Sequence, residues 1–448
     1  MSWAQDAMFY HIYPLGLCGA PERNDFTSAP VPRLESLSPW IDHIAALNLN
    51  AVYLGPLFES TRHGYDTADY FQVDRRLGDE QTLKRIVGAM KARGLRVILD
   101  GVFNHVGRDF WAFRDVQANG RDSPYVGWFH SISFDGRSPL GDPFSYEGWA
   151  GHHDLVKLNL KHPEVREHLF RAVEMWIREF AIDGLRLDAA DVMDHDFLRA
   201  LAEHCRHLRP DFWLMGEVVH GDYRQWAHPQ VLDATTNYEA YKSLYSSHAD
   251  RNYFEIAYTL NRQFGSGGLY RGLPLYAFAD NHDVSRVASK LTHSAHLYPL
   301  HILLFTIPGV PSIYYGSEWG IAGIRTDSSD RMLRPCLRLD PTPFPEPELA
   351  ECIRRLAALR RDLPALRTGD YEQLYVASEQ FAFARRTADQ TIIVAVNASA
   401  EELSIPLRES RPMFDLLNGE PVEGGRVTLH PHWGAVVVLE SERARTND

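Results

Sequence analysis

The sequence contains few cysteines and fewer basic than acidic residues. Its 448 residues include 4 cysteines, and none of them shows CxxC spacing, so we expect neither a structural zinc site nor a disulfide framework. Lys and Arg total 46 against 59 Asp and Glu, which gives a formal charge of −13. Because phosphate contacts need clustered cations, this balance argues against nucleic acids and acidic membrane surfaces as partners.

The sequence also lacks a long apolar run. No segment approaches the roughly 18 uncharged apolar residues of a membrane-spanning helix. The first residues, MSWAQDA, have neither the basic stretch nor the apolar core of a secretory signal. We therefore expect a cytoplasmic protein with no membrane partner.

Short apolar runs alternate with helical patterns along most of the chain. Eight runs are predicted strands, at 8–13, 51–54, 96–99, 184–187, 212–215, 231–233, 275–279 and 311–315. Helical patterns between them include 79–93, 162–180 and 196–209. This alternation predicts an α/β fold in which a closed parallel (β/α)8 TIM barrel is formed. A doubly wound open sheet is the competing arrangement, but no GxGxxG follows the first run.

Two regions break this alternation. Segment 106–155 is rich in Gly, Pro, Asp and aromatic residues and has no clear helical pattern, so we expect a subdomain inserted after the third strand. A Pro-rich stretch at 340–347 and a predicted helix at 348–361 follow the last barrel strand. Short alternating runs then predict a C-terminal antiparallel β-sandwich at 369–448, which leaves 1–105 and 156–368 for the barrel.

Acidic residues follow four of the predicted strands. Asp100 follows the third strand, Asp188 the fourth, Glu217 the fifth and Asp283 the seventh. In a parallel barrel these strand ends meet at one face, where catalytic groups lie. A single acid at a strand end is more often a helix N-cap, but four of them together predict an active site.

The spacing of the residues indicates what some of these groups do. Arg186 and Asp188 lie two positions apart in a strand, so both side chains point to the barrel mouth. We expect Arg186 to lower the pKa of Asp188 and so keep a nucleophilic carboxylate ionised. Glu217, at the end of an apolar strand near other carboxylates, suits a general acid. His105 and His282 follow two of these strands, although either alone is equally well explained by a turn or an ion pair.

The sequence blocks around these residues resemble the signature regions of the α-amylase superfamily of retaining glycoside hydrolases. They are DGVFNH at 100–105, GLRLDAADV at 184–192, GEVV at 216–219 and FADNHD at 278–283. HGYDTADY at 63–70 and PSIYYGSEWG at 311–320 also match. The blocks occur in the family's order, and the resemblance covers nearly the whole chain.

The resemblance implies a role for each of these residues. It implies Asp188 as the nucleophile, Glu217 as the acid/base and Asp283 as the third acid, which favours a distorted sugar. Asp100 is implied to be the structural partner of Arg186. The predicted substrate-binding residues are Tyr65 as a stacking platform, His105, Arg186, His220 on the leaving-group side, His282 and Arg334 in the loop after the eighth strand.

Two features narrow the resemblance within the family. Calcium-dependent members carry Lys-His soon after the nucleophile, where this chain has Ala-Ala-Asp at 189–191, so no metal and no cofactor are predicted and Asn104 is expected to be structural. The segment LVKLN at 155–159 resembles the MPKLN motif of cyclomaltodextrinases and neopullulanases. The β domain that precedes the barrel in that group is not expected here, because the first predicted strand starts near residue 8.

The sequence therefore predicts an enzyme that hydrolyses α-1,4 bonds of maltooligosaccharides or small cyclic dextrins with retention. A transglycosylase or isomerase of the same family stays open, as does an enzyme that also cleaves α-1,6 bonds. A more remote alternative is a non-catalytic binding subunit. The predicted partner is a small α-glucan, with a homodimer left open and neither nucleic acid nor membrane expected.

Overall fold

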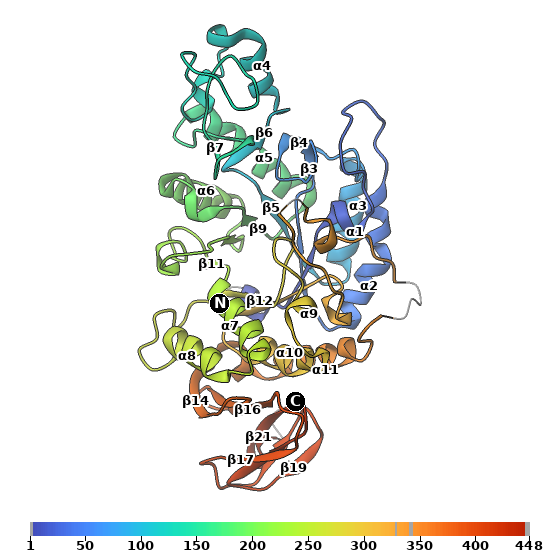
Figure 1. Ribbon diagram of the computed structural model, residues 1–448, viewed down its shortest axis with the longest axis vertical. Helices are drawn as coiled ribbons and strands as arrows, with labels where there is room; N and C mark the ends of the chain where they lie inside the picture. Colours follow the sequence, from blue (N-terminus) through green and yellow to red (C-terminus); the bar gives the residue numbers. More distant parts are fainter. Residues whose placement is uncertain (1–2, 328, 340–343, 444–448) are drawn as a thin grey trace.

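A closed barrel forms the centre of the computed structural model, which describes residues 3–327, 329–339 and 344–443 (Figure 1). Its parallel sheet has the order β11-β10-β9-β5-β2-β1-β13-β12. Thr236, directly after β11, bridges Tyr276 of β12 and closes the sheet. The barrel strands are β1 (Phe9–Ile12), β2 (Ala51–Leu54), β5 (Arg96–Gly101), β9 (Gly184–Leu187), β10 (Trp213–Gly216), β11 (Ala234–Thr235), β12 (Tyr276–Phe278) and β13 (Val310–Tyr314). The predicted TIM barrel is confirmed.

The sixth barrel strand lies later in the chain than predicted. The prediction at 231–233 is wrong, because β11 is Ala234–Thr235. The apolar pair Val231 and Leu232 is buried in the loop before the strand. Asp233 ends that loop and accepts a hydrogen bond from the Leu214 N–H at 2.8 Å. A two-residue strand of small side chains leaves no apolar run for sequence reasoning to detect.

Helices surround the barrel, and their ends follow the capping rules. α3 begins after Asp79, which accepts from Thr82 N–H at 2.8 Å, and α6 begins after Asp194, which accepts from Phe197 N–H at 2.9 Å. The helices are α1 (Pro14–Leu17), α2 (Ser38–Ala46), α3 (Glu80–Ala92), α5 (Pro163–Phe180), α6 (His195–Leu208), α7 (Tyr238–Ala249), α8 (Tyr253–Phe264), α9 (Val287–Lys290), α10 (Leu297–Thr306), α11 (Leu349–Asp362) and α12 (Pro364–Thr368). Within the described ranges, no helix is long and apolar enough to cross a bilayer.

A small region with its own sheet lies between β5 and α5, at the top of Figure 1. It contains β6 (His105–Gly107), α4 (Trp111–Asn119), β7 (Gly148–Trp149) and β8 (His152–Lys157), and its sheet order is β6-β8-β7. The expectation that this segment lacks a helix is wrong. α4 forms because Ala112, Phe113 and Val116 fall on one side of it and are buried. The hairpin β3 (Phe58–Ser60) and β4 (Thr67–Val73) precedes this region in the chain.

The C-terminal region, drawn in red in Figure 1, is antiparallel throughout. A six-stranded sheet of order β14-β15-β16-β21-β18-β19 faces the pair β17-β20. A separate apolar core that includes Ile393, Ile405 and Val427 lies between them. The strands are β14 (Asp370–Val376), β15 (Gln380–Arg386), β16 (Thr391–Asn397), β17 (Leu403–Pro406), β18 (Met413–Asp415), β19 (Glu420–Val422), β20 (Arg426–Leu429) and β21 (Trp433–Leu439), followed by α13 (Glu440–Arg443). The predicted β-sandwich is confirmed, whereas the domain limits 1–105, 106–155, 156–368 and 369–448 stay a prediction.

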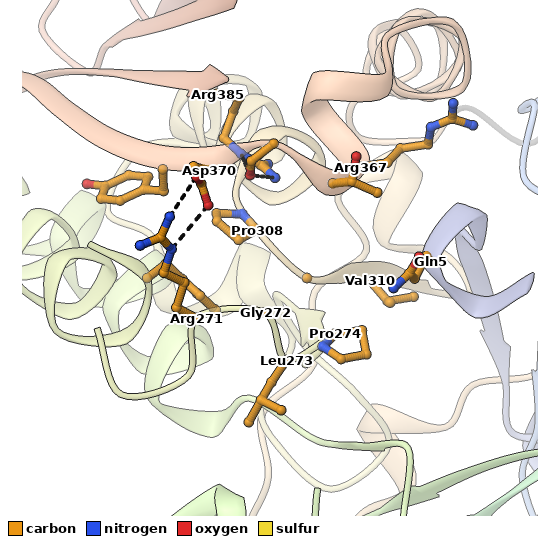
Figure 2. Close-up of a pocket in the computed structure, with 15 residues that line it drawn as sticks. Gln5, Arg271, Gly272, Leu273, Pro274, Pro308, Val310, Arg367, Asp370 and Arg385 are labelled. Carbon is orange, nitrogen blue, oxygen red and sulfur yellow. Dashed lines mark hydrogen bonds and ion pairs between the residues drawn. The ribbon is translucent and has the colours of Figure 1, made fainter. Parts of the chain in front are cut away.

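The C-terminal sheet packs against the amino end of the barrel. Arg385 of β15 donates to the carbonyls of Thr306 at 2.6 Å and Leu366 at 2.8 Å, and it is 1% exposed. A cavity of about 160 Å³ lies at this junction. Figure 2 shows the residues that line it, among them Arg271 paired with Asp370. The first four residues of the predicted Pro-rich stretch at 340–347 fall outside the described ranges.

Candidate active site

Three carboxylates surround one guanidinium at the carboxyl ends of β5, β9 and β10. Arg186 is 2% exposed, and its Nη1 donates to Asp188 Oδ1 at 2.7 Å and to Asp100 Oδ1 at 3.0 Å. Its Nη2 lies 2.8 Å from Glu217 Oε2. The strand register explains the arrangement, because Arg186 pairs with Asp100 across β9 and β5. The predicted contacts of Arg186 with Asp100 and Asp188 are present.

Two further groups hold the Glu217 side chain. The Ala189 N–H donates to Oε2 at 3.1 Å, and the Tyr238 hydroxyl donates to Oε1 at 3.1 Å. Ala189 adopts φ 48°, so the chain turns sharply after Asp188 and directs this N–H toward Glu217. Asn281 Nδ2 in turn donates to the Tyr238 hydroxyl at 3.3 Å.

Asp283 belongs to a second cluster that adjoins the first. His282 Nε2 lies 2.9 Å from Asp283 Oδ2, and Arg334 Nη2 lies 3.0 Å from Oδ1. Arg334 also donates from Nε to the His282 carbonyl at 3.0 Å. The Tyr65 ring stacks on His282 with centroids 5.2 Å apart, and its hydroxyl contacts both His282 Nε2 and Asp100 Oδ2. Tyr65 therefore links the two clusters.

The two remaining predicted residues differ in their placement. His105 Nε2 lies 3.9 Å from Asp188 Oδ2, is buried, and has no hydrogen-bond partner within the described ranges. Burial lowers the pKa of His105 to about 3, so its imidazole is neutral. His220 is exposed and lies near Asp191 at the rim. The cavity in Figure 2 contains none of the predicted site residues, because it lies at the amino end of the barrel.

The pKa of Asp188 in the first cluster and that of Asp283 in the second are shifted in opposite directions. Burial raises the pKa of Asp188 well above its usual range; Arg186 opposes this effect, and the Glu217 and Asp100 carboxylates add to it. The predicted lowering of this pKa by Arg186 is wrong as a net direction, because the sequence does not reveal how deeply the carboxyl is buried. For Asp283, burial acts against ionisation, but His282 and Arg334 outweigh it and hold its pKa well below the usual range.

Asp188 and Glu217 share one guanidinium. Both contact neighbouring nitrogens of Arg186. The Glu217 carboxylate therefore adds to the effect of burial in raising the pKa of Asp188.

Sequence reasoning missed three tyrosines of this site. Tyr53 donates to Asp100 Oδ2 at 2.7 Å, the Tyr13 ring lies 4.6 Å from the Arg334 guanidinium, and Tyr238 holds Glu217. Tyr13 directly follows β1, so the strand-end rule would have found it if applied beyond acids and histidines. Tyr238 was hidden because the strand before it was predicted too early in the chain.

The sequence profile of the α-amylase catalytic domain matches residues 32–335. The chain belongs to the α-amylase family. It is a glycoside hydrolase of this family, and its relatives include cyclomaltodextrinases, a neopullulanase and maltogenic amylases.

Individual relatives of this α-amylase family member match over most of its length. A cyclomaltodextrinase from Bacillus sp is 35% identical over 88% of this chain and 73% of its own. An intracellular maltogenic amylase from Bacillus subtilis is 29% identical over 88% of this chain and 68% of its own. The solved structure of the cyclic α-maltosyl-(1→6)-maltose hydrolase from Arthrobacter globiformis superposes with a TM-score of 0.83 at 29% identity, covering 98% of this chain and 99% of that one.

The calcium site of calcium-dependent α-amylases does not fit the residues of this family member. Asn104 is 1% exposed, and its Nδ2 donates to the ring of His105 at 3.2 Å. Ala189 and Ala190 offer no side-chain ligand, and Asp191 accepts from the Val219 N–H at 3.4 Å. In the described part of the chain, no three His, Cys, Asp or Glu side chains are grouped to hold a metal. Independence from calcium stays a prediction.

Proposed function

We propose that this enzyme cleaves α-1,4-glucosidic bonds of maltooligosaccharides or small cyclic dextrins by double displacement. Asp188 acts as the nucleophile and Glu217 as the acid/base. The observation that carries the proposal is the shared guanidinium of Arg186, whose two terminal nitrogens contact these carboxyls at 2.7 and 2.8 Å. This proximity is compatible with the separation of about 5–5.5 Å that a retaining pair requires.

The first step forms a covalent bond between Asp188 and the anomeric carbon. Glu217 donates its proton to the glycosidic oxygen as the bond to the leaving sugar breaks. Tyr238 and the Ala189 N–H support Glu217, since their hydrogen bonds fix the orientation of its carboxyl group. In the second step Glu217, now ionised, removes a proton from water, which attacks the anomeric carbon and frees Asp188.

The second cluster supplies the binding site for the sugar that is attacked. Asp283, held ionised by His282 and Arg334, accepts hydrogen bonds from ring hydroxyls and favours the distorted sugar. His105 has a buried ring nitrogen beside Asp188 that finds no hydrogen-bond partner in the described part of the chain, which suits a hydroxyl contact. Tyr65 presents its ring as a platform, and His220 meets the leaving-group side at the rim.

Two observations favour a small substrate. The region between β5 and α5 stands beside the carboxyl end of the barrel, because β6 starts at His105 and β8 pairs with it. It forms a wall on one side of the site, and a walled site favours a compact ligand. The solved relative that matches over 99% of its length is a hydrolase of cyclic α-maltosyl-(1→6)-maltose, a small cyclic sugar. We also propose that the enzyme acts inside the cell, as the name of the Bacillus subtilis relative suggests.

Stereochemistry tests the catalytic pair most directly. NMR of the product within the first turnovers should show the α-anomer. A first-formed β-anomer would refute the pairing of Asp188 with Glu217.

A product time course on maltotriose, cyclodextrins, pullulan, isomaltose and starch tests the substrate. We expect kcat/KM at least roughly tenfold higher on a maltooligosaccharide or small cyclodextrin than on soluble starch, a difference of about 1.4 kcal/mol. Products longer than the substrate would identify a transglycosylase, and cleavage of isomaltose would add α-1,6 activity. Equal efficiency on starch would contradict the walled site.

Two further expectations have simple tests. Activity should survive EDTA, and a loss restored only by calcium would reveal a different metal site.

Whether the enzyme forms a homodimer stays open, and light scattering on the purified enzyme decides it.

A further inference from the structure

Four histidines form a row across the junction between the barrel and the C-terminal sheet. His248 lies near the end of α7, His293 and His296 precede α10, and His432 precedes β21. The ring centroids of His248 and His296 are 5.9 Å apart, and those of His296 and His432 are 5.3 Å apart. His293 stacks on His432 at 4.8 Å with an interplanar angle of 19°. We call these four residues the histidine row.

One carbonyl oxygen ties the two sides of the junction together. His296 Nε2 donates to the Ala398 carbonyl at 3.0 Å, and His432 Nδ1 donates to the same oxygen at 2.8 Å. His296 belongs to the barrel, whereas Ala398 directly follows β16 of the C-terminal sheet. Because a carbonyl only accepts hydrogen bonds, each ring carries its hydrogen on the bonded nitrogen. The added proton of a charged His296 would sit on Nδ1, which is buried without a partner in the described ranges.

The histidine row has little negative charge around it. Within the ranges that the structure describes, no carboxylate forms an ion pair with any of the four rings. The acid that acts on His296 is Glu379, between β14 and β15, and both of its oxygens already bind Arg251 at 2.6 and 3.0 Å.

The other titratable neighbours of the row offer no negative charge at neutral pH. The Tyr253 hydroxyl of α8 contacts His248 Nε2 at 2.8 Å, and His301 of α10 also faces His248. A proton on His296 is therefore disfavoured by protons on His293 and His432, and the interaction with His432 acts across the junction.

We propose that the histidine row is an acid-sensitive joint, whose protonation loosens the contact between the C-terminal sheet and the barrel. Opening the joint returns the rings to water, where charge is tolerated. The closed joint keeps the buried rings of His248 and His296 neutral, because a charge on either would be removed from water. This inference concerns the coupling of two regions and does not depend on the proposed glycosidase mechanism.

The direction of the pH dependence follows from the buried members. Burial lowers the pKa of His296, and burial lowers the pKa of His248 to about 3. In the open form both return to the ordinary value of about 6.5. The open form therefore binds more protons below that pH, so the closed joint is fully stable above about 6.5 and loses stability as the pH falls below it.

Two conservative substitutions remove the imidazoles of His296 and His432 but keep their hydrogen bonds, and His248 is unchanged. His296→Gln places an amide N–H where Nε2 donates, and His432→Asn places one where Nδ1 donates. Hydrogen exchange of the amides at 397–399, 430, 432 and 433, corrected for intrinsic rates, measures the opening of the joint at pH 7 and pH 5. One proton taken up on opening increases the opening constant tenfold per pH unit. From pH 7 to pH 5, we expect the opening constant of the unmodified protein to rise by a factor at least about ten times larger than that of the double variant.

His430→Asn is the matched control, because His430 is exposed, lies two residues before His432 in the chain and pairs with Glu402 outside the row. It should keep the pH dependence of the unmodified protein. The same dependence in the double variant and the unmodified protein would overturn the proposal, as would acid-enhanced exchange spread evenly over the barrel. If the double variant fails to fold at pH 7, each single variant is tested. The proposal would also be overturned if, in both single variants, the opening constant depended on pH at least as steeply as in the unmodified protein. The readout uses no substrate, so it stands apart from any failure of the glycosidase proposal.

Discussion

The two ends of strand β9 carry opposite arrangements of charge. At the carboxyl end one cation, Arg186, contacts three carboxylates. At the amino end one carboxylate, Asp183, contacts three cations: Lys91 at 2.6 Å, Arg96 at 2.9 Å and Arg209 at 2.7 Å. Asp183 and Arg186, only three positions apart, thus belong to a cluster with surplus base and a cluster with surplus acid.

This difference separates reactivity from stability. Asp183 is completely buried, and its Oδ2 also accepts from the Val97 N–H at 2.8 Å, so its ionised form is fully satisfied. Its cations are 24–38% exposed at the side chain and keep contact with water. At the carboxyl end the acids outnumber the guanidinium and are themselves buried, which raises the pKa of Asp188. A perturbed pKa among buried carboxyl groups is typical of a catalytic site, whereas the satisfied cluster is suited to holding strands and helices together.

The largest expected effect comes from removing the proposed nucleophile. Asp188→Asn should lower kcat by at least roughly 10³-fold, because no covalent intermediate can form. Its midpoint of thermal unfolding should stay the same or rise, since one of several crowded carboxylates is lost. Steady-state kinetics and calorimetry on the same preparation check both parts. A folded Asp188→Asn protein with near-normal turnover would break the contrast between the ends of β9.

The corresponding change at the other end should act on stability instead. Asp183→Asn leaves Lys91, Arg96 and Arg209 without a shared counter-ion, and we expect a loss of about 3–5 kcal/mol in the free energy of unfolding. The kcat of the folded fraction should stay within about threefold of the unmodified enzyme, because the two clusters share no partner. Urea unfolding together with active-site titration checks this expectation. A large fall in kcat without a fall in stability would mean that the ends are coupled.

A charge-conserving substitution sharpens the comparison through pH. Lysine offers one ammonium in place of the planar guanidinium, so Arg186→Lys cannot contact Asp100, Asp188 and Glu217 together. Arg186 opposes the raised pKa of Asp188, so weakening it should raise that pKa further. As the pH falls, activity that needs ionised Asp188 should then disappear at a higher pH than in the unmodified enzyme. The acidic limb of the pH profile should move upward by about one unit.

We expect kcat of Arg186→Lys to fall by about 10- to 100-fold, as for a hydrogen bond to a charged group. Arg96→Lys makes the same exchange in the other cluster and should leave the pH profile unchanged. An unmoved acidic limb in Arg186→Lys would show that Arg186 does not set the ionisation of the pair.

The sequence predicted the chemistry of one end of β9 but not that of the other. Strand periodicity was enough to place Arg186 beside Asp188, because alternation along a strand is a local property. Asp183 was not singled out, since Lys91 and Arg209 reach it from helices whose orientation depends on the whole barrel. The pKa of Asp188 was predicted in the wrong direction for the same reason, because burial is a tertiary quantity.

The prediction of strands and helices failed where the local sequence pattern differs from the contacts that the residues make in the folded protein. Strand β11 has only two small residues, and the apolar pair Val231 and Leu232 before it belongs to a buried loop. Helix α4 was not predicted because the composition of its segment is typical of a loop, although three of its residues are buried on one side of the helix. Long strands and helices with regular periods were placed within a few residues, because their patterns agree with their final packing.

The smallest effect should come from a single hydroxyl, and it tests a residue that only the structure revealed. Tyr238 donates to Glu217 Oε1 at 3.1 Å, and Asn281 supports its hydroxyl. Tyr238→Phe removes this bond but keeps the ring, which packs on Phe278 with centroids 5.1 Å apart. We expect kcat to fall about tenfold, the effect of losing one hydrogen bond to a carboxyl that must hold a fixed orientation.

The control for Tyr238→Phe lies at the opposite end of the barrel. Tyr371 lines the cavity of Figure 2, and its buried hydroxyl has no hydrogen-bond partner within the described ranges. Tyr371→Phe should therefore leave kcat unchanged and should not lower stability, since an unsatisfied buried hydroxyl costs free energy. Equal effects of the two substitutions on kcat would mean that the Tyr238 hydroxyl does not act through Glu217. An effect of Tyr238→Phe alone, with KM unchanged, would place this tyrosine among the groups that position the acid.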